Sequence, residues 1–241
     1  MIILGVETSA VSAGAAIVKD GKLISETFLN TGLTHSQTVM TLIDSVLKNA
    51  GLTFNDVNAV AVAAGPGSFT GIRIGVSAVK GLCFSENLPC WPVSTLEAMA
   101  NGVDMSDCII CPVMDARCMQ VYNALFKKIN NAVARITDDK PKTLQELAEE
   151  LKSFSEKIVL VGDGTEIAFK FLSEKGINVH KFSEIYRFQH ASGVAITAFR
   201  NYNNGEHFIS ADELQPVYLR LSQAERELNK SGVNNNDCVK Q

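Results

Sequence analysis

Clusters of positive charge are scarce in this sequence. Its 241 residues include 22 Lys and Arg against 26 Asp and Glu, which gives a formal net charge of -4. No segment gathers more than two or three basic residues. Proteins that bind nucleic acid unaided neutralise several phosphates with such residues. We therefore expect the isolated chain to bind nucleic acid only weakly.

Long apolar runs are also missing. A helix that crosses a membrane needs about 18 or more consecutive apolar residues, and no such run occurs. The opening residues, MIILGVETSA, lack the basic start and the small-residue cleavage site of a secretory signal. We expect a cytoplasmic protein that makes no membrane contact.

The sequence also lacks the two cysteine pairs that hold a structural zinc ion. One C-x-x-C occurs, at Cys108 and Cys111, and no second pair accompanies it. A structural zinc site needs four ligands, whereas these two cysteines flank Ile109 and Ile110 in an apolar strand pattern. Buried Cys behaves as a small hydrophobic residue, so we expect reduced thiols in a core.

Apolar material, in contrast, is sufficient for a full core. Hydrophobic residues make up 46% of the chain and charged residues 20%, which is typical of a globular rather than a disordered protein. A chain of this length is expected to form two domains of roughly 100 to 130 residues each.

The first hundred residues alternate between strand and helix patterns. Asp20-Gly21 signals a hairpin, and Gly51 and the run Gly65-Pro66-Gly67 end apolar segments. The order βββαβαβα follows. The predicted strands cover residues 2–6, 13–18, 22–29, 59–64 and 91–93. The predicted helices cover residues 36–49, 71–84 and the stretch that Ser94 or Thr95 caps.

The same order begins again at Cys108. The predicted strands cover residues 108–114, 120–127, 132–136, 157–161 and a short stretch near Val179. The predicted helices cover residues 143–152, 166–175 and 192–202. This α/β pattern resembles two duplicated ribonuclease-H-like halves around a cleft, the layout of the actin-like ATPase fold. The predicted units are residues 1–104, residues 105–230 and a mobile tail at 231–241.

Four segments resemble the TsaB family of bacterial tRNA-modification proteins, also called YeaZ. They are GVETS from Gly5, AAGPGSFTGIRIGVSAVKGL from Ala63, PVMDARCMQVYNALF from Pro112 and QPVYLR from Gln215. Together they span residues 5–220 in the order of the family, and the GPGSFTGIR stretch is the most specific.

The resemblance implies a pseudo-enzyme subunit that pairs with the similarly folded enzyme TsaD. The ATPase TsaE joins this assembly, which places threonylcarbamoyl on adenosine 37 of tRNAs that read codons beginning with A. The resemblance further implies that tRNA is contacted only through the complex and that no cofactor is held. It also implies a homodimer, in which self-association competes with TsaD for one face.

Two turns are candidate vestiges of a phosphate site. In active actin-like ATPases the first hairpin carries an acid that positions hydrated magnesium, and the corresponding turn here is Glu7-Thr8-Ser9. In the second half Gly162-Asp163-Gly164-Thr165 follows a strand and opens a helix, a place suited to an anion. Simple closure of a turn explains both segments as well.

Two further motifs, the glycine-rich adenosine motif and the paired metal-binding histidines, are incomplete in this sequence. The glycine-rich adenosine motif is represented only by Ala191-Ser192-Gly193-Val194, so a complete ATP site is not expected. TsaD holds a metal through two histidines four positions apart on a helix, whereas Val39 stands four positions after His35. We predict no metal. The Asp115-Ala116-Arg117 turn either braces itself with a charged pair or contacts a partner or ligand across the cleft.

The first two predicted helices carry apolar arcs wider than one buried stripe. The arc of the first helix spans roughly 160°, and that of the second is at least as wide. Gly71 and Gly75 leave room for another helix to approach. We predict that these helices form the partner face. The residues assigned to it are His35, Val39, Met40, Ile43, Leu47, Phe69, Ile72, Arg73, Val76, Val79 and Lys80.

Three rival hypotheses stay open on the sequence alone. An active actin-like phosphotransferase is disfavoured by Glu7 in place of the usual Asp and by the reduced adenosine motif. A glycoprotease-like peptidase lacks both a Ser, His and acid constellation and a His-Glu-x-x-His run. A free-standing dimeric scaffold is the third.

Overall fold

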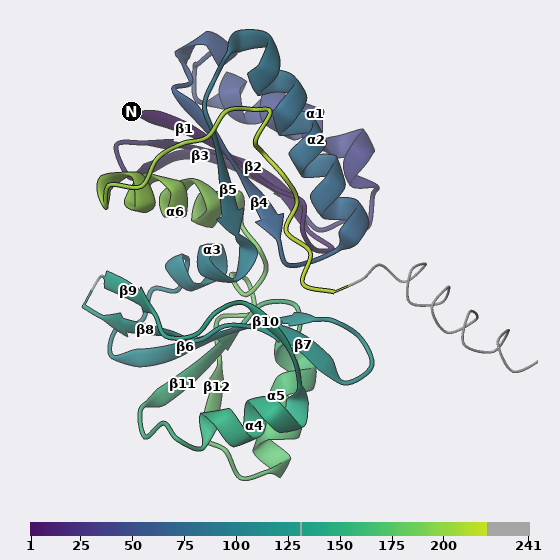
Figure 1. The fold of residues 1–241 in the computed structure, drawn as a ribbon, viewed down its shortest axis with the longest axis vertical. Coiled ribbons are helices and arrows are strands. Elements are labelled where there is room, and N and C mark those ends of the chain that lie inside the picture. Colours follow the sequence, from purple (N-terminus) through teal and green to yellow (C-terminus); the bar gives the residue numbers. More distant parts are fainter. Residues whose placement is uncertain (131, 221–241) are drawn as a thin grey trace, which may run out of the picture.

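The computed structural model describes residues 1–130 and 132–220. Two β-sheets are stacked along the long axis of the molecule, with helices between them and on both outer sides (Figure 1). The predicted α/β architecture is confirmed. The predicted tail at residues 231–241 lies outside the described residues.

The first sheet has the strand order β3-β2-β1-β4-β5. Its first three strands form an antiparallel meander, and β4 and β5 are added parallel to β1. The Asp20-Gly21 turn joins β2 to β3 as predicted. The strands are β1 (Ile2–Glu7), β2 (Ala13–Lys19), β3 (Lys22–Leu29), β4 (Ala59–Gly65) and β5 (Cys90–Ser94).

Helices cover both faces of the first sheet. On one face α1 (His35–Asn49) and α2 (Phe69–Glu86) pack against the sheet in a single buried cluster with Leu4, Val6 and Val62. A short 3-10 turn, η1 (Phe54–Asp56), precedes β4. Strands β1 and β4 are buried on both sides, which explains their nearly continuous apolar sequence.

The second sheet has the order β10-β7-β6-β11-β12, with β8 paired to β6 and β9 paired to β8. Its outer face is covered by α4 (Leu144–Leu151) and α5 (Thr165–Glu174). Thr143 caps α4 as predicted, in a reciprocal pair with Glu146. The strands are β6 (Cys108–Asp115), β7 (Gln120–Asn123), β8 (Phe126–Ile129), β9 (Ala132–Arg135), β10 (Lys140–Thr143), β11 (Lys157–Val161) and β12 (Val179–Lys181).

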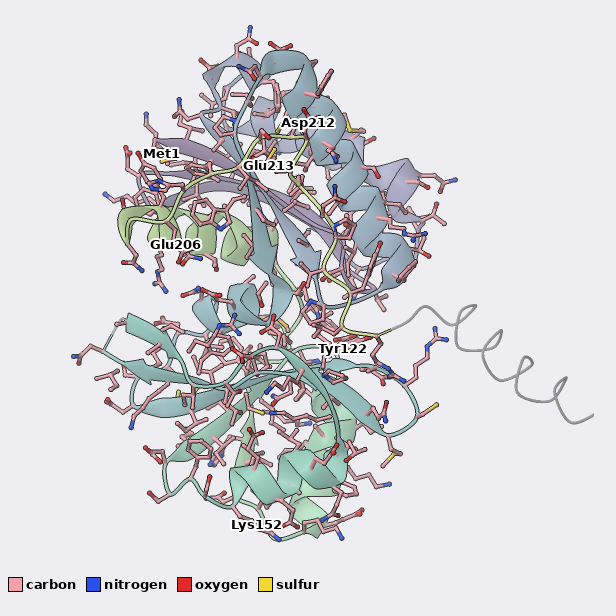
Figure 2. All side chains as sticks on the ribbon, viewed as in Figure 1. Met1, Tyr122, Lys152, Glu206, Asp212 and Glu213 are labelled. Carbon is pink, nitrogen blue, oxygen red and sulfur yellow. The ribbon has the colours of Figure 1, made fainter. Side chains whose placement is uncertain are left out.

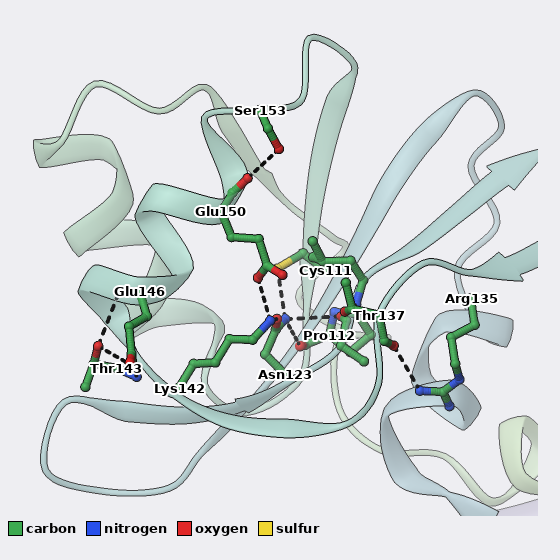
Figure 3. A network of polar contacts seen from close by, with 12 residues as sticks. Cys111, Pro112, Asn123, Arg135, Thr137, Lys142, Thr143, Glu146, Glu150 and Ser153 are labelled. Atoms are coloured by element: carbon green, nitrogen blue, oxygen red, sulfur yellow. Dashed lines mark hydrogen bonds and ion pairs between the residues drawn. The ribbon is translucent and has the colours of Figure 1, made fainter.

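The prediction of one strand over residues 120–127 was wrong, because the structure has two strands, β7 and β8. Strand β7 pairs with the end of β6 and strand β8 with its start. Between these pairings lies Pro112, which has no N–H for the ladder. Its carbonyl instead accepts a hydrogen bond from the Asn123 side chain at 2.8 Å (Figure 3). Lys142 Nζ donates a hydrogen bond to Asn123 Oδ1 at 3.1 Å and forms an ion pair with Glu150.

Helices α3 (Thr95–Asn101) and α6 (Ala191–Asn203) form a layer between the two sheets (Figure 1). Leu96 and Met99 of α3 belong to a cluster with the second sheet, whereas Ala98 belongs to a cluster with the first. Ser94 caps α3 through the Glu97 N–H, as predicted. The short helix therefore contributes to two hydrophobic cores.

Helix α6 lies on the first sheet, although its sequence follows the strands of the second. Val194, Ala195 and Ala198 pack in one cluster with Ile3 and Trp91. The chain then stays beside the first sheet, where residues 90 and 209 form a β-bridge. The proposed division near residue 104 stays a prediction. Helix α6, Ile209, Ala211 and Leu214 pack with the first sheet, although they belong to the predicted second unit.

The start of α6 approaches β1 so closely that the contact requires glycine. A methyl group at Gly5 would stand 2.4 Å from the carbonyl oxygen of Ala191. We predict that Gly5→Ala forces α6 away from the sheet and lowers the free energy of unfolding by about 1–3 kcal/mol. Urea denaturation followed by circular dichroism measures this loss.

Gly81→Ala is the matched control. Gly81 is inside α2, and a methyl group built there meets no atom within 4 Å from elsewhere in residues 1–130 and 132–220, beyond its chain neighbours and its own helix backbone. This variant is expected to be more stable than the parent by about 0.5–1 kcal/mol, because alanine favours the helix. Equal stability of the Gly5→Ala variant and the parent would contradict the close approach.

Candidate functional site

A cleft of about 580 Å³ lies between the two sheets. The first sheet contributes the turn after β1 and the turn between β4 and α2. The second contributes the turn after β6 and Asp163, which follows β11. Residues 217–220 complete the lining. Figure 2 labels Tyr122, another lining residue, at the level where the sheets face each other. The cleft therefore brings together segments that are distant in sequence.

The predicted Glu7-Thr8-Ser9 turn is placed at this cleft and is entirely buried. The Thr8 hydroxyl donates to the carbonyl oxygen of Gly71 at 2.8 Å and so attaches the turn to α2. The Ser9 N–H donates to Glu7 Oε1 at 2.5 Å. Ser9 lines the cleft. Closure of the turn therefore accounts for Thr8, while Ser9 and Glu7 keep polar atoms without partners among the described residues.

The Gly162-Asp163-Gly164-Thr165 turn presents a carboxylate to the cleft. Three of its backbone donors are engaged within the protein: Gly162 N–H donates to Arg187 O at 2.7 Å, Gly164 N–H to Val113 O at 3.0 Å and Thr165 N–H to Gly162 O at 3.2 Å. Asp163 is its cleft-lining residue. Both predicted turns thus meet at one site. Phosphate binding there stays a prediction, and two carboxylates oppose it electrostatically.

The Glu7 and Asp163 carboxyl groups influence each other across the boundary between the sheets. Burial, with a smaller contribution from Asp163, raises the pKa of Glu7 from 4.5 to about 7, although the hydrogen bond from Ser9 opposes the shift. Burial also raises the pKa of Asp163, against the hydrogen bond that Gln189 Nε2 donates at 3.0 Å. Burial therefore disfavours the ionised forms of both carboxyl groups.

The Asp115-Ala116-Arg117 turn lines the same cleft. Asp115 Oδ1 accepts the backbone N–H of Arg117 at 2.7 Å, so the carboxylate braces the turn without engaging the guanidinium. Arg117, Cys118 and Met119 all have left-handed φ angles, of 63°, 53° and 58°. Such a run is costly for residues other than glycine. A contact of Arg117 with a partner or ligand stays a prediction.

The segment QPVYLR, which carried the resemblance near the end, connects the two sheets. Val217 N–H donates to Ala64 O at 2.7 Å. The Tyr218 ring stacks on Phe69 at 4.2 Å, and Arg73 Nε donates to the Tyr218 hydroxyl at 2.8 Å. Arg220 donates to the carbonyl of Ala116 in the turn after β6 at 2.9 Å. Sequence reasoning assigned no role to this segment, which no local pattern could have linked to the cleft.

Most residues predicted for the partner face point into the core. The wide apolar arcs of α1 and α2 are covered by the first sheet and, in the same cluster, by Ala211 and Leu214. The argument that these arcs exceed what the protein buries was therefore wrong. The predicted residues that are buried are Val39, Ile43, Leu47, Ile72, Val76 and Val79.

Gly71 and Gly75 also face the interior of the protein, where they lie against Thr8. A methyl group at Gly71 would stand 2.1 Å from Thr8 O, and one at Gly75 would stand 2.3 Å from Thr8 Oγ1. These glycines allow α2 to approach the turn after β1, so the expectation that they admit a partner helix was wrong. His35 likewise turns inward, with Nε2 2.7 Å from Ala10 O.

The outward surface of α1 and α2 keeps a smaller set of the predicted residues. The side chain of Met40 is 48% exposed. Arg73 is exposed, Phe69 is half-buried, and Lys80 Nζ donates to Asp212 O at 3.2 Å. Phe84, at 69% exposure, was missed by the sequence reasoning. The signal was a large aromatic residue on the polar side of the helical pattern.

The cysteine prediction is confirmed for the two strand residues. Cys108 and Cys111 are buried and free, and they belong to clusters on opposite faces of the second sheet. Within residues 1–130 and 132–220, no group of three or more His, Cys, Asp or Glu is arranged to hold a metal. No helix in the same ranges combines the length and apolar character that a membrane crossing requires.

Comparisons with known proteins agree on one family. The family model of tRNA N6-adenosine threonylcarbamoyltransferase (TsaD) matches residues 30–228. The tRNA threonylcarbamoyladenosine biosynthesis protein TsaB of Bacillus subtilis is 32% identical over 227 residues, which cover 93% of this chain and 96% of that protein. The tRNA N6-adenosine threonylcarbamoyltransferase of B. subtilis is 33% identical over 105 residues, 37% of this chain and 30% of the enzyme.

The fold has a close structural relative. YeaZ from Pseudomonas aeruginosa superposes with a TM-score of 0.77 at 21% identity, over 90% of this chain and 99% of that one. Two sheets with helices between them, whose turns meet at one cleft, define a two-sheet α/β protein with the YeaZ fold. Within that class the extended match to B. subtilis TsaB is decisive. The chain belongs to the TsaB family, also called YeaZ.

The raised pKa of Glu7 predicts a pH-dependent penalty on stability. Between the unfolded value of 4.5 and the folded value of about 7, the folded state binds more protons, so the free energy of unfolding falls as pH rises. We predict that Glu7→Gln, which cannot ionise, is more stable than the parent by up to about 3 kcal/mol at pH 8. At pH 4.5 the difference should be close to zero.

Urea denaturation at several pH values in metal-free buffer tests this expectation. Glu206→Gln is the matched control. Glu206 is exposed and lies just after α6, the helix that packs on the first sheet (Figure 2). The control should follow the parent at every pH. A Glu7→Gln difference that stays constant from pH 4.5 to pH 8 would show that the buried carboxyl does not titrate in this range.

Proposed function

We propose that the chain is a pseudo-enzyme subunit in the biosynthesis of threonylcarbamoyladenosine in tRNA. The observation that carries this proposal is the match to B. subtilis TsaB along 96% of that protein. The target is adenosine 37 of tRNAs that read codons beginning with A. The transfer itself is performed by a partner of the TsaD type, to which this chain is similar over residues 30–228.

The partner face is the outward surface of α1 and α2. Met40 and Phe84 are large apolar side chains left exposed there, and Arg73 and Lys80 lie on the same two helices. Helix faces of this kind suit association with another helix pair. A TsaD-type partner with a similar fold offers such a pair, and a second copy of this chain offers the same one. The homodimer and the heterodimer therefore compete.

The remaining components, tRNA and the ATPase TsaE, bind the assembled complex and not the isolated chain. The net charge of -4 gives the isolated chain little means of binding phosphates. Contact with tRNA is accordingly assigned to the TsaD-type partner, and the ATPase TsaE joins the assembled pair. A tRNA substrate makes the cytoplasm the site of action.

We predict that Met40→Asp and Phe84→Asp each weaken binding to the TsaD of the same organism. Each places a carboxylate in a contact that excludes water, at a cost of about 2 to 5 kcal/mol. The dissociation constant should rise about thirtyfold or more. Biolayer interferometry with folded proteins measures this rise.

Ile185→Asp is the matched control, because Ile185 is 74% exposed in the segment between β12 and α6. It introduces the same charge away from α1 and α2 and should bind as the parent does. Val76→Asp is unsuitable as a test, because Val76 is 3% exposed and faces the sheet. If Met40→Asp and Phe84→Asp both bind like the control, the partner face lies elsewhere.

We further predict that the isolated chain hydrolyses ATP and transfers threonylcarbamoyl at negligible rates. The N–H groups of Gly162, Gly164 and Thr165 are occupied by internal carbonyls, so the turn has few backbone donors left for a phosphate. ATP hydrolysis by purified protein measures the first rate. A turnover that persists to constant specific activity and disappears in Glu7→Gln would restore the phosphotransferase hypothesis.

A further inference from the structure

The cleft between the two sheets is lined by opposite charges that do not pair with each other. Asp115 and Asp163 line it, and so do Arg117 and Arg220. None of these four side chains forms an ion pair within residues 1–130 and 132–220. A half-buried carboxylate such as that of Asp163 is costly without a cation. The cleft therefore holds unused charge of both signs.

Short internal contacts keep some of these charges in place. Asp115 Oδ1 accepts the backbone N–H of Arg117 at 2.7 Å. Arg220 donates to the carbonyl oxygen of Ala116 at 2.9 Å. Both contacts use the backbone of the turn after β6, so they hold a carboxylate and a guanidinium without joining one to the other. A solute that carries both signs of charge can satisfy groups that the protein leaves unpaired.

The acidic side of the cleft belongs to the second sheet. Asp115 ends β6, and Asp163 follows β11, the parallel neighbour of β6. A methyl group at Gly164 would stand 3.0 Å from Asp115 N, so the two acids lie on adjacent segments. An ammonium group suits them, because it donates three hydrogen bonds and favours the ionised form of a carboxylate.

The donor side of the cleft belongs to the first sheet, where α2 begins. Phe69 and Thr70 are the first two residues of this helix, and both line the cleft. Their backbone N–H groups make no hydrogen bond to any other residue in the described part of the chain. The positive end of a helix dipole and free N–H groups together favour an anion.

Ser9 is a second and independent donor at this end. Its side chain is fully buried, and its Oγ has no partner among the residues that the structure describes, yet Ser9 lines the cleft. Ser9 O accepts the N–H of Ser68, the residue that caps α2, at 2.6 Å. A methyl group at Gly67 would stand 3.0 Å from Ser9 Cβ. The unused hydroxyl therefore lies beside the start of α2.

We propose that this cleft binds a zwitterionic amino acid with a large apolar side chain. The carboxylate of the ligand accepts from the start of α2 and from Ser9, and its ammonium group donates to the two acids. A simple cation would leave the donors unused, and a multiply charged anion would be repelled by the acids. The inference goes beyond the partner role proposed above, because it concerns a solute bound by the isolated chain.

The size and the aromatic lining of the cleft indicate the side chain of the ligand. The volume of about 580 Å³ is more than the charged end of an amino acid fills. The rings of Phe69, Tyr122 and Tyr218 line the same space. Ligand pockets typically combine such apolar and aromatic walls with a few polar groups that fix orientation. An aromatic amino acid matches both parts of the lining.

Isothermal titration calorimetry of the full chain with L-phenylalanine tests the proposal. A single molecule should bind per chain, with a dissociation constant below about 1 mM. Phenethylamine lacks the carboxylate, and hydrocinnamate lacks the ammonium group. Each should bind at least about tenfold more weakly than L-phenylalanine, because each loses one set of charge-assisted hydrogen bonds.

Two variants test whether the ligand lies in the cleft. Ser9→Ala removes the unused hydroxyl, and Asp163→Asn removes a charge from the opposite side. In each the dissociation constant for L-phenylalanine should rise about tenfold or more. Asp138→Asn is the matched control, because Asp138 is exposed between β9 and β10 and does not line the cleft. It should bind as the parent does.

The parent protein alone can overturn the proposal. If it binds no L-phenylalanine up to about 10 mM, tenfold above the expected limit, the cleft is not an amino-acid site. Equal binding of hydrocinnamate or phenethylamine shows that the cleft does not recognise both charges. Binding that is unchanged in both Ser9→Ala and Asp163→Asn places the ligand elsewhere and is equally decisive. None of these results bears on TsaD binding, which is measured separately.

Discussion

The layer formed by α3 and α6 between the two sheets is the contact on which the rest of the structure depends. Each sheet must bury its inner face, and this layer supplies apolar side chains to both. Helices α3 and α6 can come close because Gly193 has no side chain. A methyl group at Gly193 would stand 2.5 Å from Ala98 O. This layer joins the two sheets, and the turns after β1 and β6 meet at a single cleft.

The cleft and the outer surface of α1 and α2 differ in the side chains that they present. The cleft is lined by Ser9, Asp115 and Asp163, and several backbone donors around it are engaged within the protein. The outer surface of α1 and α2 instead keeps Met40 and Phe84 exposed. A match to the TsaD family model over residues 30–228 does not by itself carry the chemistry of that family. In our proposal this chain contributes through its surface.

Most of the fold could be predicted, because strand and helix periodicities are local properties. The predictions failed where a distant residue intervened. Pro112 interrupts the ladder of β6 and divides its neighbour into β7 and β8. The arcs of α1 and α2 looked too wide because Ala211 and Leu214, from the end of the described chain, cover part of them. Helical periodicity reports how much apolar surface exists but not what covers it.

The sequence by itself determined most of the strands, the helices, the caps at Ser94 or Thr95 and at Thr143, the core role of Cys108 and Cys111, and the family. These depend on local propensity, periodicity and motifs that short segments carry. Only the tertiary structure decided that Ser9 and Asp163 line one cleft and that α6 returns to the first sheet. Contacts between residues far apart in the chain follow from the joint packing of all layers, because each buried face accepts whichever segment fills it best.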